Sequence, residues 1–315
     1  MRILFMGTPE FARVSLKYII EAGFEVIGVV SQPDRPKGRG MELQSSEVKL
    51  LALEHQLPVW QPEKVDTTEF VDLFQKLKPD LVVVVAFGQK IPSKILFGAK
   101  YGCINVHGSL LPKYRGAAPI QCCLLNGDCR TGITTMYMDE GWDTGDIIYQ
   151  ESLEIHPNEN FGTLYTRLAE LGGELLVKTI KDIEKGVAPR IKQNNEFACL
   201  APKIKPELQQ IDWNQSAQMI HNLIRTCNPV PGAETFFSQE RLKILETRLL
   251  DELPISDIQN NPGTILQVIK KQGIVIATGD SALLITKVQP AGKKPMSALD
   301  YANGRSLKSG MVFGK

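Results

Sequence analysis

The sequence predicts an α/β fold with a mostly parallel sheet, followed by a smaller domain built from short β-strands. The first half of the chain alternates short apolar runs with longer amphipathic segments, which is the pattern of a sheet covered by helices. Towards the C-terminus, short alternating runs are separated by glycine and proline turns. A length of 315 residues gives each of two domains enough chain to bury its own core.

Four strands are expected in the first half, at residues 2–6, 25–31, 80–87 and 103–110. The unbroken apolar run at 81–85 is typical of a central parallel strand that is buried on both faces. Amphipathic helices are expected at residues 9–22, 46–56, 67–77 and 161–185. For the first of these helices Thr8 is the expected N-cap, and Pro9 and Glu10 suit its first turn.

The second half predicts a connecting segment, one helix and a group of short strands. Residues 197–210 mix prolines with charges and lack a sustained period, which is typical of a linker, and an amphipathic helix is expected at 216–226. Short strands, which together favour a small barrel, are expected at 233–237, 243–249, 264–269, 274–278 and 282–288. The expected division is a first domain at 1–190, a linker at 191–208 and a second domain at 209–315.

The charge, cysteine and apolar content restrict the classes of function. The net charge is only +1, so overall attraction cannot explain nucleic-acid binding, which would need a local basic surface. The six cysteines contain no Cys-x-x-Cys pair and no histidines at zinc-ligand spacing, so we expect reduced thiols and no metal site. No apolar run approaches the length of a membrane span or a secretory signal, so a cytoplasmic protein is expected.

The segment NVHGSLLPKYRG, residues 105–116, is the most informative part of the chain for function. Because side chains alternate across a strand, Asn105 and His107 face the same way if this segment is extended. An amide donor and an imidazole would then converge on one atom, which is the geometry of an oxyanion site. The alternative is a strand end whose polar side chains satisfy nearby backbone groups.

A second polar segment, at residues 131–150, supplies a carboxylate for His107. It contains two alternating stretches around an Asp-Glu-Gly, with Asp143 and Asp146 close to the glycines Gly141 and Gly145. A carboxylate next to a catalytic imidazole holds it in one orientation and stabilises its charged form. We assign this role to Asp143 and interpret Asp146 as a turn residue that caps its own backbone, which is also the alternative for Asp143.

Taken together, NVHGSLLPKYRGAAPI at 105–120 and MDEGWDTGDI at 138–147 resemble the signature of the folate-dependent formyltransferases. The resemblance begins with RILFMGTPEFA at the N-terminus, continues through SQPDRPKGRG at 31–40 and extends into the C-terminal domain. Nearly the whole chain resembles the members of this family that act on methionyl-tRNA. The resemblance implies a catalytic domain with a Rossmann-like, mostly parallel sheet, followed by a small OB-like β-barrel domain that binds tRNA.

The resemblance also implies roles for individual residues. In the family an Asn, a His and an Asp are catalytic, and they match Asn105, His107 and Asp143. The residues associated with the folate donor match Ser109, Leu110, Leu111 and Pro112. The backbone around Phe87, Gly88 and Ile91 is implied to receive the pterin ring, although from the residues alone this segment is equally a simple strand-to-helix turn.

Two groups of basic residues provide a candidate RNA-binding surface. Arg35, Lys37 and Arg39 alternate with proline and glycine in a loop after the second expected strand, which predicts a mobile cationic segment near the ligand edge of the sheet. The C-terminal domain is enriched in basic residues that only Asp280 and Asp300 oppose over the same interval. These are Lys270, Lys271, Lys287, Lys293, Lys294, Arg305, Lys308 and Lys315, of which the candidate tRNA contacts are Lys270, Lys271, Lys293 and Lys294. The alternatives are phosphate contacts and a solvated surface, and the resemblance favours RNA.

The resemblance implies transfer of the formyl group of 10-formyltetrahydrofolate, a cosubstrate, to the α-amino group of methionyl initiator tRNA. Initiator methionyl-tRNA is then the partner, and no metal, membrane or obligate protein partner is implied. Two alternatives remain open. One is a formyltransferase that acts on an amino-sugar nucleotide or another small amine, and the other is a noncatalytic RNA-binding protein with a ligand-sensing α/β domain.

Overall fold

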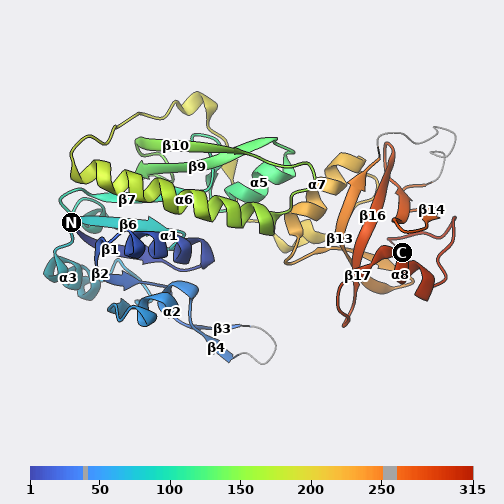
Figure 1. The fold of residues 1–315 in the computed structure, drawn as a ribbon, viewed down its shortest axis with the longest axis horizontal. Coiled ribbons are helices and arrows are strands. Elements are labelled where there is room, and N and C mark those ends of the chain that lie inside the picture. Colours follow the sequence, from blue (N-terminus) through green and yellow to red (C-terminus); the bar gives the residue numbers. More distant parts are fainter. Residues whose placement is uncertain (38–41, 251–260, 315) are drawn as a thin grey trace. The chain divides into compact units, whose positions relative to one another are not determined.

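The computed structural model describes residues 1–37, 42–250 and 261–314, and within it the chain forms two compact units (Figure 1). The first unit contains Met1–Pro119, Arg130–Leu153 and Tyr165–Ala201. The second unit contains Ile120–Cys129, Glu154–Leu164 and Pro202–Lys315. No helix in the described part of the chain is both long and apolar enough to cross a membrane.

The first unit is built on a seven-stranded sheet with the order β10-β9-β7-β6-β1-β2-β5. The parallel strands are β1 (Arg2–Gly7), β2 (Glu25–Val30), β5 (Val59–Trp60), β6 (Leu81–Val85) and β7 (Cys103–His107). At one side β9 (Arg130–Tyr137) pairs antiparallel with β7, and β10 (Ile147–Glu154) follows it. The expected α/β fold with a mostly parallel sheet is therefore confirmed, and β6 is buried along its whole length.

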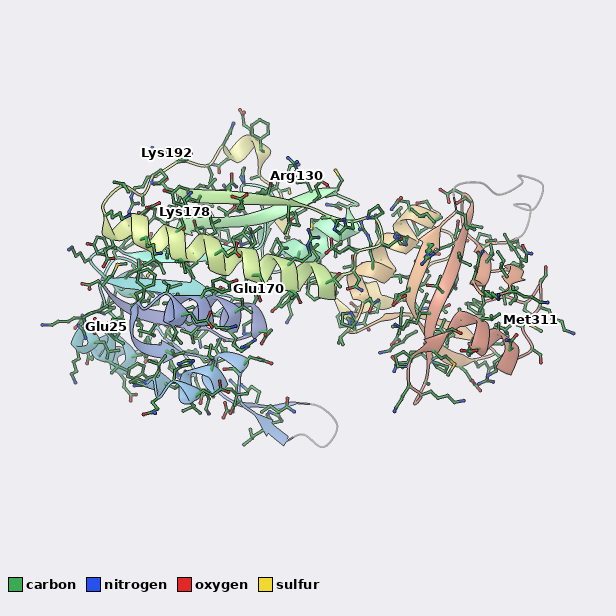
Figure 2. All side chains as sticks on the ribbon, viewed as in Figure 1. Glu25, Arg130, Glu170, Lys178, Lys192 and Met311 are labelled. Carbon is green, nitrogen blue, oxygen red and sulfur yellow. The ribbon has the colours of Figure 1, made fainter. Side chains whose placement is uncertain are left out.

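Helices cover this sheet, and all but the shortest of them lie at positions that apolar periodicity predicts. They are α1 (Glu10–Glu21), α2 (Glu47–Glu54), α3 (Thr68–Leu77), the short α4 (Ser93–Leu96) and α6 (Phe161–Glu184). On one side of the sheet, Phe70 and Phe74 of α3 share a core with Leu4 and Met6 of β1. Figure 2 labels Glu170 and Lys178 on α6, where Glu170 accepts a hydrogen bond from Tyr18 and Lys178 lies over the Tyr149 ring.

One expected helix cap is wrong. The N-cap position of α1 is occupied by Pro9, and no side chain caps it. Thr8 instead donates its hydroxyl to the backbone oxygen of Phe87, at 3.2 Å. A carbonyl from the turn after β6 therefore competes with the helix end for this hydroxyl, and the bond joins the turns that follow β1 and β6.

The second unit contains an antiparallel sheet with the order β12-β13-β16-β15-β14, and β17 pairs with β16. Its strands are β12 (Ala233–Phe237), β13 (Glu240–Leu249), β14 (Ile265–Ile269), β15 (Gly273–Ala277), β16 (Ala282–Pro290) and β17 (Met296–Ser297). Ile220 and Ile224 of α7 (Ala217–Cys227) share a core with Ile244 of the sheet and with Tyr301 of α8 (Ala298–Gly304).

The expected small OB-like barrel is not confirmed. Among the described residues the strand pairing runs from β12 to β14 without joining these two strands to each other. Helices α7 and α8 bury the apolar face of the sheet, so burial of the core does not depend on closure of the sheet into a barrel. The second unit is therefore an antiparallel sheet covered by helices. The short α5 (Pro119–Leu125) lies almost entirely in this unit, although it follows the 105–116 motif in sequence.

The two units do not divide the chain by one cut between residues 190 and 209. Residues 191–201, expected as part of a linker, belong to the first unit. There Ile191 forms a bridge with Ile147, and β11 (Leu200–Ala201) pairs in parallel with β8 (Arg115–Gly116). These contacts are made by the main chain, so the proline and charge content of the segment gives no sign of them.

Candidate active site

Strand β7 carries both polar residues of the 105–116 motif to the carboxyl end of the sheet. Asn105 pairs with Val84 of β6, and its side-chain amide donates to the Val84 backbone oxygen at 3.0 Å. His107, the last residue of β7, is buried, with its Nε2 atom 2.9 Å from the Tyr114 backbone oxygen. Since a carbonyl only accepts, Nε2 carries the proton in this bond.

Asp143, in the connection between β9 and β10, lies close to His107. Its Oδ2 atom lies 3.7 Å from His107 Nδ1, and both side chains are mostly buried. The same oxygen accepts a hydrogen bond from the Gly116 backbone N–H at 2.8 Å. The structure therefore brings the imidazole, the carboxylate and the end of the 105–116 motif together, and a proton on Nδ1 would face a carboxylate oxygen.

The remaining polar groups of the β9–β10 connection have other contacts. Asp146 was interpreted as a cap of its own backbone, but its carboxylate faces Arg190 at 3.8 Å, so that interpretation is wrong. Asp139 caps the turn instead, because it accepts from the Gly141 N–H at 3.0 Å and from the Thr144 hydroxyl at 2.7 Å. The sequence places several carboxylates near the glycines of this connection, and only the fold shows that Asp139 is the one that caps the turn.

The loop that follows His107 is held from inside by hydrogen bonds. The Ser109 hydroxyl is buried and donates to the Lys113 backbone oxygen at 2.6 Å. Thr134 of β9 donates to the Ser109 backbone oxygen at 2.6 Å and accepts from the Leu111 N–H at 3.0 Å. Gln150 of β10 donates to the Leu111 backbone oxygen at 2.8 Å. Leu111 is also buried, whereas Leu110 and Pro112 are half-buried and Lys113 is exposed.

The turn after β6 buries its large apolar side chains and exposes backbone at Gly88. Phe87 and Ile91 are buried in the core of the first unit. Gly88 between them is exposed and has a φ of +85°, in the left-handed region that glycine adopts without strain. Ala86 and Lys90 are also exposed, so this turn offers a ligand main chain and small or polar side chains.

Arg115 and Gln193 also belong to the site, although neither was predicted. Arg115 is buried and donates to the Gln193 side-chain oxygen from Nε at 3.1 Å and from Nη2 at 2.7 Å. The Gln193 amide nitrogen donates to the backbone oxygens of Asp143 at 2.9 Å and Gly145 at 2.8 Å. Arg115 stands inside the motif and could have been suspected, whereas Gln193 lies 50 residues after Asp143 without any local signal.

The candidate basic residues at 35–39 are only partly described. Arg35 and Lys37 lie in a two-stranded ribbon formed by β3 (Arg35–Lys37) and β4 (Glu42–Gln44), where a loop was expected. Arg35 pairs with Glu63 at 2.5 Å, and both side chains are exposed. Arg39 and the distant Lys315 fall outside the residues that the structure describes.

The candidate lysines of the second unit lie in two turns. Lys270 and Lys271 are exposed between β14 and β15, and Lys293 and Lys294 are exposed after β16. Because β15 runs antiparallel to β16, these two turns come at the same end of the sheet. Two other basic residues of this interval have acidic partners outside it: Lys287 pairs with Glu246 at 3.0 Å, and Arg305 pairs with Glu240.

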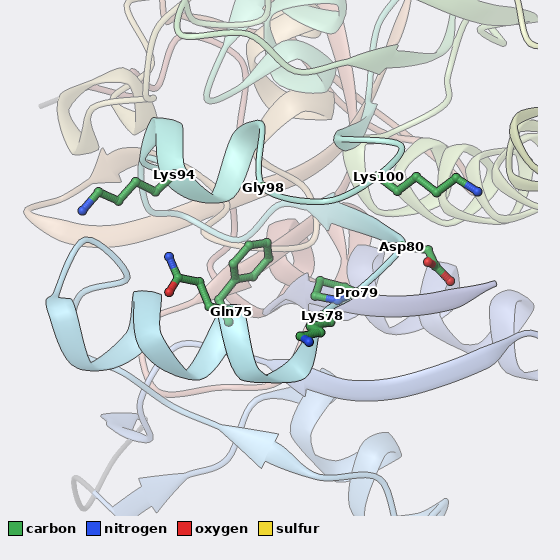
Figure 3. A pocket seen from close by; sticks show the side chains of 8 residues that line it. Gln75, Lys78, Pro79, Asp80, Lys94, Gly98 and Lys100 are labelled. Atoms are coloured by element: carbon green, nitrogen blue, oxygen red, sulfur yellow. The ribbon is translucent and has the colours of Figure 1, made fainter.

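A separate hollow of about 400 Å³ lies elsewhere on the first unit (Figure 3). Its lining includes Lys78, Lys94, Lys100 and Asp80. Asp80 directly precedes β6, so the hollow lies at the amino end of the parallel strands, whereas His107 lies at their carboxyl end. In the described residues, no group of three or more His, Cys, Asp and Glu side chains is placed to hold a metal ion.

Comparison with known proteins decides the family. A family model described as Formyl transferase matches residues 1–180, and one described as Formyl transferase, C-terminal domain, matches residues 203–306. The methionyl-tRNA formyltransferase of Clostridioides difficile is 47% identical over 314 residues, with 100% of both chains covered. The chain belongs to the methionyl-tRNA formyltransferase family. The corresponding protein of Alkaliphilus oremlandii is 46% identical, again with 100% of both chains covered.

Solved structures share the fold at lower sequence identity. An N-formyltransferase from Helicobacter canadensis has a TM-score of 0.65 and 21% identity, and the match covers 91% of this chain and 98% of that one. A methionyl-tRNA formyltransferase from Clostridium thermocellum has a TM-score of 0.55 and 19% identity, covering 80% of this chain and 94% of that one. At these identities the match establishes the fold of the formyltransferases and does not identify the acceptor.

Proposed function

We propose that this chain transfers the formyl group of 10-formyltetrahydrofolate to the α-amino group of methionyl initiator tRNA. The observation that carries this proposal is the meeting of His107 with Asp143 at the carboxyl end of β7, 3.7 Å apart. This pair lies in a chain whose relatives, named as methionyl-tRNA formyltransferases, match it over its full length. The geometry supports acid–base chemistry, and the relatives support this donor and acceptor.

The transfer is a direct displacement at the formyl carbon. The neutral amine forms a bond to this carbon, negative charge gathers on the formyl oxygen, and the bond from the carbon to N10 then breaks. The amine loses a proton and N10 gains one. Asn105 and His107 donate hydrogen bonds to the oxygen, and each donor of this kind is worth about 2.7 to 4 kcal/mol in other acyl transfers.

His107 has to exchange a protein contact in order to act as a donor. Its Nε2 is bonded to the Tyr114 oxygen, so donation from Nε2 to the formyl oxygen replaces that bond. Asp143 faces the other ring nitrogen and stabilises the imidazolium that forms when His107 accepts a proton. Asn105 gives one amide hydrogen to Val84 and keeps a second for the substrate.

The donor is assigned to the two loops beside this pair. We assign the folate to Ser109, Leu110, Leu111 and Pro112, together with the backbone around Phe87, Gly88 and Ile91. Support comes from the internal hydrogen bonds that fix the first loop and from the exposed Gly88 in the second. The Helicobacter canadensis N-formyltransferase, which shares this fold, was solved with folinic acid.

We assign binding of the acceptor to basic residues outside the proposed folate site. Arg35, Lys37 and Arg39 follow β2, whose carboxyl end lies at the same edge of the sheet as His107. In the second unit, which we propose to work as an OB-like tRNA-binding module, the contacts are Lys270, Lys271, Lys293 and Lys294. Lysines contribute attraction to the phosphate backbone without reading the sequence of the RNA. No other partner is required, and the reaction belongs to the cytoplasm.

A comparison of acceptors tests this function. The protein is given 10-formyltetrahydrofolate with a labelled formyl group, together with methionyl initiator tRNA, methionyl elongator tRNA or an amino-sugar nucleotide. We expect the initiator tRNA to be labelled with the highest kcat/KM. Faster labelling of the amino-sugar nucleotide would overturn the assigned acceptor, and absence of transfer to every acceptor would leave the noncatalytic RNA-binding alternative.

A further inference from the structure

The backbone conformation of Asp143 is unusual and requires a restraint. Asp143 has a φ of +55°, in the left-handed region that residues with a side chain rarely adopt. Gly145, two residues later, approaches the Tyr137 oxygen so closely that a Cβ on it would lie 1.8 Å away. The β9–β10 turn that carries the carboxylate facing His107 is therefore tight.

Besides Asp139 within the turn, a side chain from a distant segment restrains it. The amide nitrogen of Gln193 donates to the backbone oxygens of Asp143 and Gly145, at 2.9 and 2.8 Å, and so spans the tight part of the turn. The orientation of the amide is fixed by its partners, because Arg115 presents only donors to Oε1 and the two carbonyls present only acceptors to Nε2.

The contacts close a ring around Asp143. Gln193 is bonded to the side chain of buried Arg115, and the next residue, Gly116, donates its N–H to the Asp143 carboxylate at 2.8 Å. Arg115 is itself held by its backbone N–H, which donates to the Cys199 oxygen at 2.9 Å. The backbone oxygen of Asp143 is thus bonded to Gln193, and its carboxylate is bonded to Gly116. Gln193 is bonded to the Arg115 side chain, and Gly116 is the next residue in the chain after Arg115.

We propose that Gln193 is a positioning residue for formyl transfer, which acts by holding Asp143 in register with His107. It touches the reaction only through Asp143, and this inference rests on the proposed function. A small displacement of a catalytic group can cost a large factor in rate, because the reacting geometry depends on fractions of an ångström. Through Gln193, the segment 191–201 is therefore more than a connection between two domains.

The test compares two substitutions in the same segment of the full-length protein. Gln193→Glu keeps an oxygen for Arg115 but turns a second oxygen towards the carbonyls of Asp143 and Gly145, which repel it. Asn195→Ala is the matched control, because Asn195 also accepts from Arg115 Nη2, at 2.8 Å, while the structure gives it no bond to Asp143 or Gly145. We expect kcat to fall about tenfold or more in Gln193→Glu, with the KM of donor and tRNA changed by less than about threefold, and to stay near wild type in Asn195→Ala.

A double-mutant cycle separates positioning from general stability. In an Asp143→Asn background, Gln193→Glu should change kcat by less than about twofold, because the carboxylate that it positions is gone. Equal losses in both backgrounds would overturn the inference, as would unchanged kcat in Gln193→Glu. If Gln193→Glu fails to fold, the uncharged Gln193→Met replaces it in the same double-mutant cycle, with the same expected outcome. Loss of folding in both variants would also overturn the inference. The proposed function is tested separately on the wild type alone, and it fails if the wild type transfers no formyl group to initiator tRNA or labels an amino-sugar nucleotide faster.

Discussion

At the scale of single residues, the site depends on backbone groups as much as on the three side chains that the sequence identifies. Asn105 and His107 both make hydrogen bonds to carbonyl oxygens, and Asp143 accepts from a backbone N–H. These contacts fix where the side chains lie before a substrate arrives. Substitutions that displace the backbone should therefore impair the reaction without changing any catalytic side chain.

Gly116 provides a direct test of this dependence. It has a φ of +127°, and a Cβ there would lie 2.6 Å from the Ala201 oxygen. We expect Gly116→Ala to lower kcat by about tenfold or more, because the shift needed to relieve the contact moves the N–H away from Asp143. Thermal unfolding measured beside the kinetics should also show a lower Tm. Wild-type kcat and Tm in this variant would show that the close approach does not constrain the site.

At the scale of elements, the sequence was most informative where one local cause dominates. Apolar periodicity located α1, α3, α6, the strands β1, β2, β6 and β7 of the first unit and the strands β12 to β16 of the second, whereas β5, β9 and β10 were not expected. Ser46 and Thr67, the first residues of two expected helices, cap them. Thr8 failed as a cap because a distant carbonyl, that of Phe87, competes for its hydroxyl. Gln193 could not be found for the same reason, since its contacts join segments that are far apart in sequence.

The sheet of the second unit also shows that packing between distant segments cannot be predicted from local sequence. Short alternating strands were predicted well, but their number alone suggested closure into a barrel. The described residues instead show α7 and α8 packed on the sheet, and this depends on which apolar faces meet. The candidate catalytic residues could be named from local motifs, whereas their restraint by Arg115 and Gln193 required the fold.

The docking of α7 should make stability depend on pH. Burial lowers the pKa of His221 below its ordinary value of 6.5; a bond to the Pro157 oxygen opposes this effect and the charge of Arg225 adds to it. The unfolded chain then binds a proton at a pH where the folded protein does not, so stability is full above 6.5 and falls as pH drops below that value. We expect the Tm of the wild type to fall more than that of His221→Gln between about pH 7.5 and about pH 5.5. Parallel Tm curves for the two proteins would contradict this assignment.

At the scale of the whole molecule, we propose that the first unit holds the reaction centre and that the second unit provides the basic surface that binds tRNA. The net charge of +1 gives the chain no general attraction for RNA, so binding has to come from local charges. The lysines in the two turns at one end of the second sheet are the candidates, since Lys287 and Arg305 already have acidic partners.

The salt dependence of tRNA binding tests this division. Replacing Lys293 and Lys294 by Gln should weaken binding and flatten the plot of log K against log salt, because each lost phosphate contact removes a slope of roughly 0.7 to 0.9. Replacing Lys94 and Lys100, which line the hollow in the first unit, removes the same charge and serves as the control. Equal effects of the two double substitutions would mean that the turn lysines are ordinary surface residues.

The most direct test of the central claim is the single-turnover rate of formyl transfer from 10-formyltetrahydrofolate to methionyl initiator tRNA, measured for the wild type and for His107→Ala at saturating concentrations of both substrates. We expect the rate to fall about 10²-fold or more, while donor and tRNA binding change much less. Adding Asp143→Ala to His107→Ala should cause little further loss, because the two residues act as a unit. A rate equal to that of the wild type in His107→Ala would contradict the account.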